Sequence, residues 1–320
     1  DAPGGRHEVS RGAQAAALGI VLTAIDADAV MIIEAPNEGR RRSTVRALEN
    51  FARICGLRTR RALIGFPSET DQEIALLYDP DVVTARHDPR GAITGKEGSA
   101  DAPRFDGVFR FDPGGEAAAE TISFSRPPPE LAVETAAGRS FRMSGVHAKS
   151  KAPHGARSEA EALRLSIANR RKQLAQCIWL RQRVEHHLAA GESLIVLGDL
   201  NDGPGIDGFE KLFGVSGVEI VLGHDAPAHL RLHDPHAALA LRQHIGVVPT
   251  TARFFVLPEA RYFPALLDYI MVSPDLAALC PRWRIWHPFD DPVCWRTPEL
   301  REALLAASDH FPVTLDLPPD

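Results

Sequence analysis

The chain has 320 residues, 44% of them hydrophobic and 24% charged, and a formal net charge of −6 at pH 7. This composition is ordinary for a soluble globular enzyme with a large core. The acidic balance excludes an overall basic surface for nucleic acid, so any phosphate-binding site has to be a local patch. The most apolar early run, residues 15–33, is interrupted by Asp26 and Asp28, so no transmembrane segment is predicted.

The four cysteines contain no C-x-x-C pair, which argues against a zinc site built on them. Free thiols are favoured over a disulfide between Cys280 and Cys294. The compartment stays open, with the cytoplasm favoured over secretion, and a monomer is expected.

The first predicted elements lead to an acid at the end of a strand. A helix is predicted over Ala13–Ile25, where apolar residues recur on one face. The continuous apolar run Ala29–Ile33 is typical of a central strand buried on both faces, and it ends at Glu34. Ser43 then fits as the N-cap of a helix over Thr44–Cys55.

The middle of the chain is predicted to be rich in short strands. Apolar runs indicate strands at Ile74–Tyr78, Val108–Phe111, Thr121–Phe124, Leu131–Glu134 and Phe141–Val146. The segment Arg86–Arg104 is predicted to be a mobile surface loop, and Arg126–Pro129 a stiff extended connection. The last of these strands ends at His147. Lys149 and Lys151 follow it, which suits an anionic ligand, but lysines in a loop are often only solvated.

The longest predicted helix, Ser158–Ala190, begins with a capping box of Ser158 and Glu161. It leads directly into residues 194–205, LIVLGDLNDGPG, around which the chain is organised. Four apolar residues run into a glycine, and Asp199 and Asn201 follow two positions apart. This pattern predicts a buried strand that ends at an exposed turn, where catalytic groups tend to lie. A turn rich in Asp and Asn is the plainer interpretation.

The segment Gly223–Ala252 is predicted to be loop-like with one short helix. His229, His233 and His236 have a spacing that could touch a metal, but Asp234-Pro235 interrupts any helix there. A metal site on these histidines is therefore the weaker hypothesis.

The C-terminal part carries the remaining polar motifs. Residues 266–272, LLDYIMV, are predicted to be a strand with Asp268 in its middle, and an acid in an apolar run needs a partner. The aromatic stretch Trp283–Trp295 fits core, a substrate-facing wall or a membrane-touching tip, with core as the default. Asp309 and His310, in SDHFPV, precede the closing strand Val313–Leu317.

Most of these polar residues stand at predicted strand ends. They are Glu34, His147, Asp199, Asn201, Asp309 and His310, with Asp268 inside a strand. Strand ends on one edge of a sheet converge in space even when they are far apart in sequence. Acids for a divalent metal, two histidines and an amide together suit metal-assisted phosphoester hydrolysis.

The motifs IIEAPN, GVHAKSK, GDLND, LDYIMVS and SDHFPV occur in this order along nearly the whole chain. With them the chain resembles the endonuclease/exonuclease/phosphatase superfamily, which has the deoxyribonuclease I-like fold. The resemblance implies an α+β protein, a four-layer α/β/β/α sandwich of two mixed β-sheets flanked by helices, in a single domain over residues 1–320. It also implies hydrolysis of phosphodiesters or phosphomonoesters with Mg²⁺ or Mn²⁺.

The resemblance implies a metal ligand and a water-activating group. Glu34 would bind the metal, and Asp309 would complete its site through a second carboxylate. Asp199 would orient or deprotonate the attacking water. Asn201 would hold that water or donate to a phosphoryl oxygen.

It also implies two phosphate-binding histidines. His310, oriented by Asp268, would contact the phosphate. His147 would be the second histidine on the phosphate, helped by Lys149.

Gln72 or Glu73, just before the strand at Ile74, would orient His147 by the same resemblance. Members of the superfamily usually begin with a strand whose Asn contacts the metal or its waters, and nothing before Glu34 matches it. Either that strand was removed or this member lacks it. The strand at Ala29–Ile33 would then have an exposed edge.

A nuclease-like hydrolase, with DNA among its candidate substrates, is the favoured function. A sphingomyelinase-type enzyme with Trp283–Trp295 on a membrane and an inositol-phosphate-type phosphatase are alternatives. A protruding apolar hairpin would favour the membrane enzyme, but no clear hairpin turn is visible in the sequence. A catalytically weak binding protein that keeps the fold is the third alternative. The retained polar residues argue against it, and the missing Asn argues for it.

Overall fold

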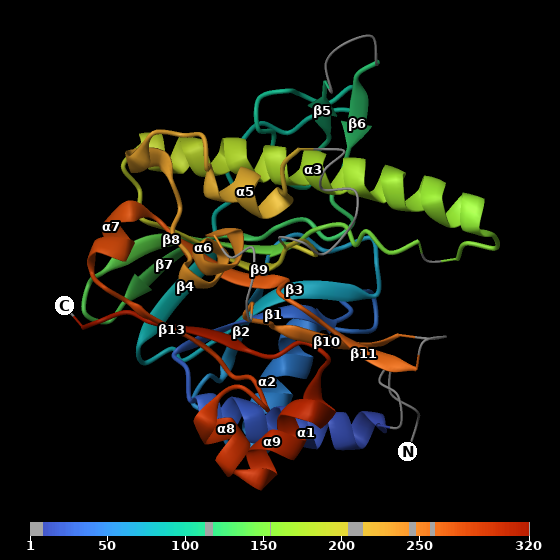
Figure 1. Ribbon diagram of the computed structural model, residues 1–320. Coiled ribbons are helices and arrows are strands. Elements are labelled where there is room, and N and C mark those ends of the chain that lie inside the picture. The colour runs from blue at the N-terminus through green and yellow to red at the C-terminus, as the bar shows by residue number, and fades with distance from the viewer. Residues whose placement is uncertain are drawn as a thin grey trace.

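The computed structural model of the chain describes residues 9–112, 118–153, 155–203, 214–242, 248–256 and 260–319. Two β-sheets pack face to face in the middle of the molecule, and helices cover the outer face of each sheet (Figure 1). The predicted α+β class and four-layer α/β/β/α arrangement are confirmed. The turn predicted at Pro204 and Gly205 lies outside the described residues.

The larger sheet is mixed and has the strand order β12-β9-β8-β7-β4. Its strands are β4 (Val83–His87), β7 (Glu130–Thr135), β8 (Ser140–His147), β9 (Leu194–Asp199) and β12 (Asp268–Val272). β8 and β9 are parallel because the long helix α3 (Glu159–Ala189) carries the chain back between them, whereas the other neighbours are antiparallel. α3 and α5 (Gly217–Leu222) cover the outer face of this sheet, where Trp179 is fully buried in one core with Val196.

The second sheet is antiparallel and has the order β1-β3-β2. Its strands are β1 (Ala29–Pro36), β2 (Arg61–Ile64) and β3 (Gln72–Tyr78). The prediction that 29–33 form a central, fully buried strand is wrong: β1 is an edge strand of the described sheet, and these residues are half-buried. Met31 packs into the core between the sheets and Ile32 packs in the core under α2 (Thr44–Cys55). The apolar run therefore reflects two partly covered faces.

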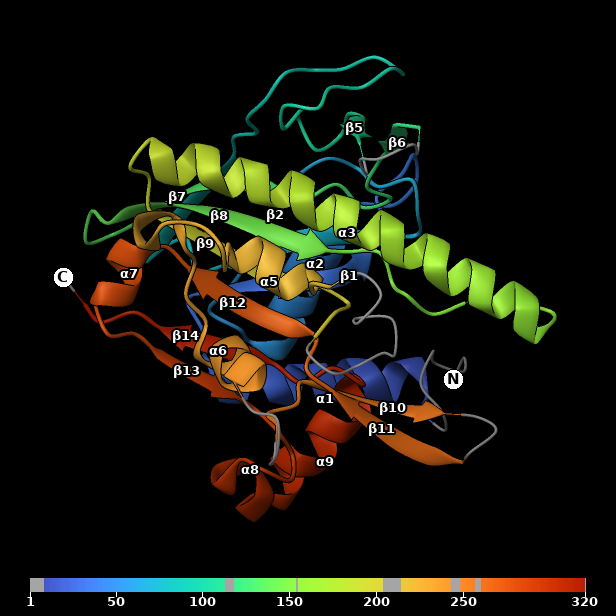
Figure 2. The same ribbon diagram turned by 45° about the horizontal axis from the view of Figure 1, so that its top comes forward.

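Three two-stranded ribbons complete the described strands. They are β5 (Phe109–Phe111) with β6 (Glu120–Ile122), β10 (Ala252–Val256) with β11 (Arg261–Ala265), and β13 (Arg282–Ile285) with β14 (Val313–Asp316). The ribbon β10–β11 projects from the body of the molecule in both views (Figures 1 and 2). The sequence did not reveal this ribbon, β2 or β4, whose end overlaps the loop predicted from Arg86. Asp268 is the first residue of β12 and not its middle.

Helices α1 (Arg11–Ile25), α8 (Pro292–Arg296) and α9 (Pro298–Ala307) lie with α2 on the side of the second sheet (Figure 1). The remaining helical segments are η1 (Ala228–Leu230), α6 (Pro235–Arg242) and α7 (Pro274–Ala278). The predicted N-caps are present: Ser43 accepts from the Arg46 N–H and Ser158 from the Glu161 N–H. The predicted capping box is incomplete, because Glu161 Oε2 accepts from the Arg157 N–H at 2.8 Å and not from the Ser158 N–H. All four cysteines are free. No helix in the described part of the chain is long and apolar enough to cross a bilayer.

Candidate active site

Three strands of the larger sheet have an apolar inner face that ends in a polar residue. Side chains alternate between the face toward the second sheet and the face toward α3. The inner-face series are Phe141, Met143, Gly145 and His147 on β8, Ile195, Leu197 and Asp199 on β9, and Val272, Ile270 and Asp268 on β12. His147 lies beside Asp199 in the pair β8–β9, and Asp199 lies opposite Asp268 in the pair β9–β12. The three polar side chains therefore form one row at the end of the inter-sheet core.

Two glycines allow this row to form. A Cβ at Gly145 would lie 2.7 Å from Sδ of Met31 and 2.9 Å from Cγ2 of Ile74, so glycine lets these side chains of the second sheet pack directly on β8. Gly198 has a φ of 133°, and a Cβ there would lie 2.1 Å from the carbonyl oxygen of Val146. The backbone that presents Asp199 therefore also requires glycine.

Asp199 is buried and is held by the turn that follows it. Asn201, with a φ of 49°, donates from its backbone N–H to Oδ1 at 2.6 Å and from Nδ2 to Oδ2 at 2.9 Å. Nδ2 also donates to the Ala148 carbonyl at 3.1 Å, and Gln173 Nε2 donates to the Asn201 carbonyl at 2.7 Å. Burial raises the pKa of Asp199 to about 7, and the negative charge of Asp268 adds to this effect. A carboxyl group with this pKa can accept a proton near neutral pH.

His310 is paired with Asp268. Nδ1 of His310 lies 2.8 Å from Oδ2 of Asp268. Thr251 fixes the backbone on both sides of this pair. Its Oγ1 accepts from the Asp268 N–H at 3.0 Å, and its carbonyl accepts at 2.6 Å from the N–H of Phe311, the residue directly after His310. Burial works against the charged imidazole, but the charge and hydrogen bond of Asp268 outweigh it and raise the pKa of His310 to about 10. His310 is therefore cationic at neutral pH.

His147 has the opposite environment. Its Nε2 lies 3.5 Å from Oδ2 of Asp199, and its Nδ1 lies 3.3 Å from Nη1 of Arg126. Burial, with the positive charges of Arg126 and His310, lowers the pKa of His147 to about 3, so this imidazole is neutral. The sequence did not identify Arg126 as a candidate site residue. Its only signal is an arginine directly before three prolines, which restrict the backbone that carries it.

Gln72 and Glu73, the two candidates for orienting His147, make different contacts. Gln72 reaches the histidine through Arg126, whose Nη2 donates to Gln72 Oε1. Glu73 is buried, and its two oxygens accept from the backbone N–H groups of Glu38 at 3.2 Å and Ser68 at 2.8 Å. Glu73 therefore organises the loops beside the site.

Glu34 is aimed by a β-bulge. The register of β1 against β3 shifts between Ile33 and Ala35, and Glu34 takes a φ of 64°. Its side chain is 50% exposed, and its Oε1 lies 3.8 Å from Nη2 of Arg126. The bulge thus turns a carboxylate out of the sheet toward the row of polar residues.

The donor chemistry suits a hard divalent cation. Asp309 is half-buried beside His310, and its carbonyl accepts from the Arg253 N–H at 2.7 Å. Within the described residues, no group of three or more acidic, histidine or cysteine side chains is arranged so that it could hold a metal ion as it stands. Besides burial, however, the charges of Asp268 and Glu34 both raise the pKa of Asp199, and a cation near Glu34 would relieve this repulsion. Carboxylate oxygens are ligands that Mg²⁺ favours.

The two lysines after His147 differ in their surroundings. Lys151 Nζ lies 2.6 Å from Oδ1 of the fully buried Asp202, which also lies 2.9 Å from Nη1 of Arg170. This cluster holds the loop after β9 against α3. Lys149 is half-buried. The pKa of Lys172 is lowered first by the burial of Lys172 and then by the positive charge of Lys149. Lys149 and Lys172 are therefore close enough for their positive charges to interact.

The histidine segment does not form a metal centre in the described part of the chain. The Asp234-Pro235 interruption is the start of α6, because Asp234 Oδ1 accepts from the Ala237 N–H at 2.9 Å. Its Oδ2 accepts from the Ile270 N–H at 3.0 Å. Asp234 thus ties α6 to β12.

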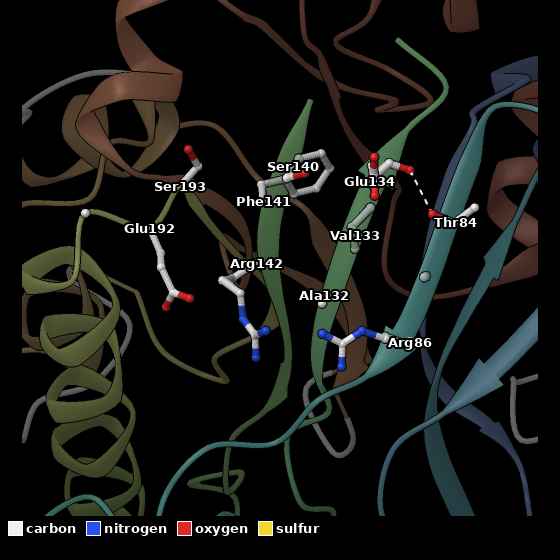
Figure 3. Close-up of a pocket in the computed structure, with 12 residues that line it drawn as sticks. Thr84, Arg86, Ala132, Val133, Glu134, Ser140, Phe141, Arg142, Glu192 and Ser193 are labelled. Atoms are coloured by element: carbon white, nitrogen blue, oxygen red, sulfur yellow. Dashed lines mark hydrogen bonds between the residues drawn. The ribbon is translucent and has the colours of Figure 1, made fainter. Parts of the chain in front are cut away.

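A hollow of about 590 Å³ lies at the opposite end of the larger sheet, where β8 and β9 begin (Figure 3). Its lining includes Arg86, Arg142 and Glu192. Both arginines are engaged by one carboxylate, since Arg86 Nη1 lies 2.8 Å from Asp88 Oδ1 and Arg142 Nη1 lies 2.5 Å from Oδ2. None of the predicted site residues lines this hollow, so it is separate from the strand-end row.

The chain matches one protein-family model, and solved structures with a similar fold are known. The model of the Endonuclease/Exonuclease/phosphatase family matches residues 5–310. The structure of D. rerio TDP2 complexed with single strand DNA product has a TM-score of 0.50 and 13% identity, covering 96% of this chain and 92% of that one. An AP endonuclease from Archaeoglobus fulgidus also has a TM-score of 0.50 and 13% identity, with 96% and 95% covered. At these identities the likeness shows the fold alone. No curated protein is similar enough in sequence to match the chain.

Proposed function

Because the chain belongs to the endonuclease/exonuclease/phosphatase family, we propose that it is a divalent-metal-dependent phosphodiesterase of the nuclease-like kind. The observation that carries this proposal is the row of His147, Asp199 and Asp268, with His310 bound to Asp268 at 2.8 Å. A base, a neutral imidazole and a cationic imidazole thus meet at one strand-end edge. Such a set suits attack by water on a phosphoryl group.

Each residue has a role in this proposal. Asp199, with its pKa near 7, takes the proton of the attacking water. The positive charge of His310 lies beside a phosphoryl oxygen and stabilises its negative charge. The neutral His147 donates a hydrogen bond to a phosphoryl oxygen. Asn201 holds Asp199 through two hydrogen bonds. Lys149 adds positive charge beside the site.

Glu34 and Asp309 would hold the metal. When bound, Mg²⁺ or Mn²⁺ would neutralise charge on the phosphoryl oxygens. Enzymes of this family generally use divalent metals. DNA is the first substrate to test, since one protein of similar fold is complexed with single strand DNA product.

A lipid-directed phosphodiesterase is the second candidate, and the ribbon β10–β11 favours it. Phe255 and Tyr262 are exposed on this ribbon with ring centroids 5.2 Å apart, and the Arg253 guanidinium lies 3.5 Å from the centre of the Tyr262 ring. Phe254, on the same ribbon, packs 5.4 Å from the ring of His310. Exposed aromatic side chains with arginine are typical of surfaces that meet a membrane interface. In the stretch Trp283–Trp295, Trp286 is core, but Phe289 and Trp295 are also exposed.

A hydrolysis panel with Mg²⁺ tests the proposal. It contains linear and circular DNA, RNA, abasic DNA, inositol phosphates and sphingomyelin vesicles, and Asp199→Asn is the inactive control. Turnover of a nucleic acid that the control lacks supports the nuclease. Turnover of sphingomyelin alone supports the lipid-directed enzyme, and no turnover of any substrate supports the binding protein.

A further inference from the structure

The Arg126 guanidinium joins three elements at the site. Its Nη1 lies 3.3 Å from Nδ1 of His147 at the end of β8. Its Nη2 donates to Oε1 of Gln72 at the start of β3 and lies 3.8 Å from Oε1 of Glu34 on β1. The side chain is only 21% exposed. The Arg126 side chain therefore bridges the two sheets beside the polar row, with His147 on one sheet and Gln72 and Glu34 on the other.

The backbone around Arg126 is held on both sides. The carbonyl of Ser125 accepts from the Glu69 N–H at 3.2 Å, and the carbonyl of Pro129 accepts from the Gly145 N–H at 3.2 Å. Pro127, Pro128 and Pro129 are buried and have no N–H of their own. The second of these bonds ties the segment to β8 two residues before His147. The guanidinium and the imidazole are thus attached to one rigid unit.

The chemistry of the two groups decides where the proton of His147 lies. Arginine has only N–H donors and does not lose its proton in proteins. The imidazole nitrogen that faces it has to be an acceptor, so Nδ1 carries no proton. A neutral imidazole then carries its proton on Nε2. That nitrogen faces Oδ2 of Asp199 at 3.5 Å, an acceptor that suits an N–H.

We propose that Arg126 is a positioning residue that holds His147 as the neutral Nε2–H tautomer. The two histidines of the site are then made unlike by unlike partners: an arginine on His147, and the carboxylate of Asp268 on His310. His147 then always presents a donor toward the row. That Nε2–H donates to a phosphoryl oxygen during turnover rests on the proposed function.

The tautomer is measurable without any substrate. The metal-free full chain is labelled with ¹⁵N-histidine, and long-range ¹H–¹⁵N correlation shows which ring nitrogen carries the proton. The signal of His147 is identified by its loss in His147→Gln. We expect Nε2–H in the parent chain and a mixture of tautomers in Arg126→Met. Arg126→Lys, which keeps one donor, should restore Nε2–H.

The matched control is Arg86→Met, which removes an arginine from the hollow at the other end of the sheet. It should leave the His147 signal unchanged. Circular dichroism establishes that each variant is folded. An Nδ1–H or doubly protonated His147 in the parent chain, or an unchanged tautomer in folded Arg126→Met, overturns the proposal.

The kinetics separate this proposal from the proposed function. On a substrate that the panel identifies, Arg126→Met should lower kcat roughly 10- to 100-fold with a smaller change in KM, and Arg126→Lys should recover part of the loss. If the tautomer shifts as expected but no phosphoester is hydrolysed, the positioning role stands and the proposed function fails. If hydrolysis is present and Arg126→Met leaves kcat unchanged, the positioning role fails.

Discussion

Asp199 and Asp268 face each other across the antiparallel pair of β9 and β12. The two carboxyl groups are compensated unequally, because Asp268 has the cationic His310 at 2.8 Å whereas Asp199 accepts from the neutral Asn201. Burial and the neighbouring charge therefore raise the pKa of Asp199 to about 7. This inequality is the basis on which we propose Asp199, and not Asp268, as the proton acceptor.

The rate of hydrolysis should rise with pH through about 7. Asp199 must lose its proton before it can accept one from water, and its pKa lies there. The measurement is kcat/KM at fixed Mg²⁺ between pH 5.5 and 8.5. A profile that is flat from pH 6 to 8 would argue that another group is the base.

Asp199→Asn should lower kcat by about two orders of magnitude or more, because the water loses its base while the side chain keeps its size. We do not expect the substitution to lower the free energy of unfolding. The folded state binds the Asp199 proton more tightly than the unfolded chain does, so the free energy of unfolding falls as pH rises from about 4 to about 7. The Asn variant lacks this loss. Denaturant unfolding at pH 5 and pH 7.5 measures the difference.

Asp202 stands three positions further in the same motif and should behave in the reverse way. It is fully buried, and it binds Lys151 at 2.6 Å and Arg170 at 2.9 Å. Asp202→Ala would leave the buried guanidinium without this counterion, so we expect a loss of roughly 3–5 kcal/mol of stability. Urea unfolding compared with that of Asp199→Asn is the check. Equal stabilities of the two variants would contradict this division of roles.

His310→Ala should strongly reduce activity and leave folding nearly intact. Asp268→Asn should cause part of the same defect, because it acts through the imidazole. The double variant should lose no more than His310→Ala alone, since both changes remove one function. A double-mutant cycle on kcat/KM measures this. Strictly additive losses would mean that Asp268 and His310 act independently, despite their contact of 2.8 Å.

Activity should require Mg²⁺ or Mn²⁺ and should stop on addition of EDTA. Zn²⁺ should be a poorer substitute, because the proposed ligands Glu34 and Asp309 are carboxylates with no thiolate among them. Glu34→Gln should weaken Mg²⁺ binding in isothermal titration. Arg86→Met, far from the site, is the control. Unchanged Mg²⁺ affinity in Glu34→Gln would remove Glu34 from the metal site.

Much of the site could be predicted from the sequence because its signals are local. A strand that ends in an acid or a histidine is visible as an apolar run followed by a polar residue, as at His147 and Asp199. Helix caps are equally local, and the predicted caps at Ser43 and Ser158 are present. The sequence by itself therefore determined which polar residues stand near strand ends, and its resemblance to the superfamily implied the four-layer fold.

Only the tertiary structure decided how those residues meet. Arg126 lies 21 positions from His147 and 54 from Gln72, in a proline segment without periodicity, so no local pattern could link them. The edge position of β1 depends on which strands pair, and hydrogen bonds between strands leave no trace in one strand's composition. The opposite charge states of His147 and His310 have the same origin. Identical imidazoles differ because the fold buries one against a guanidinium and the other against a carboxylate.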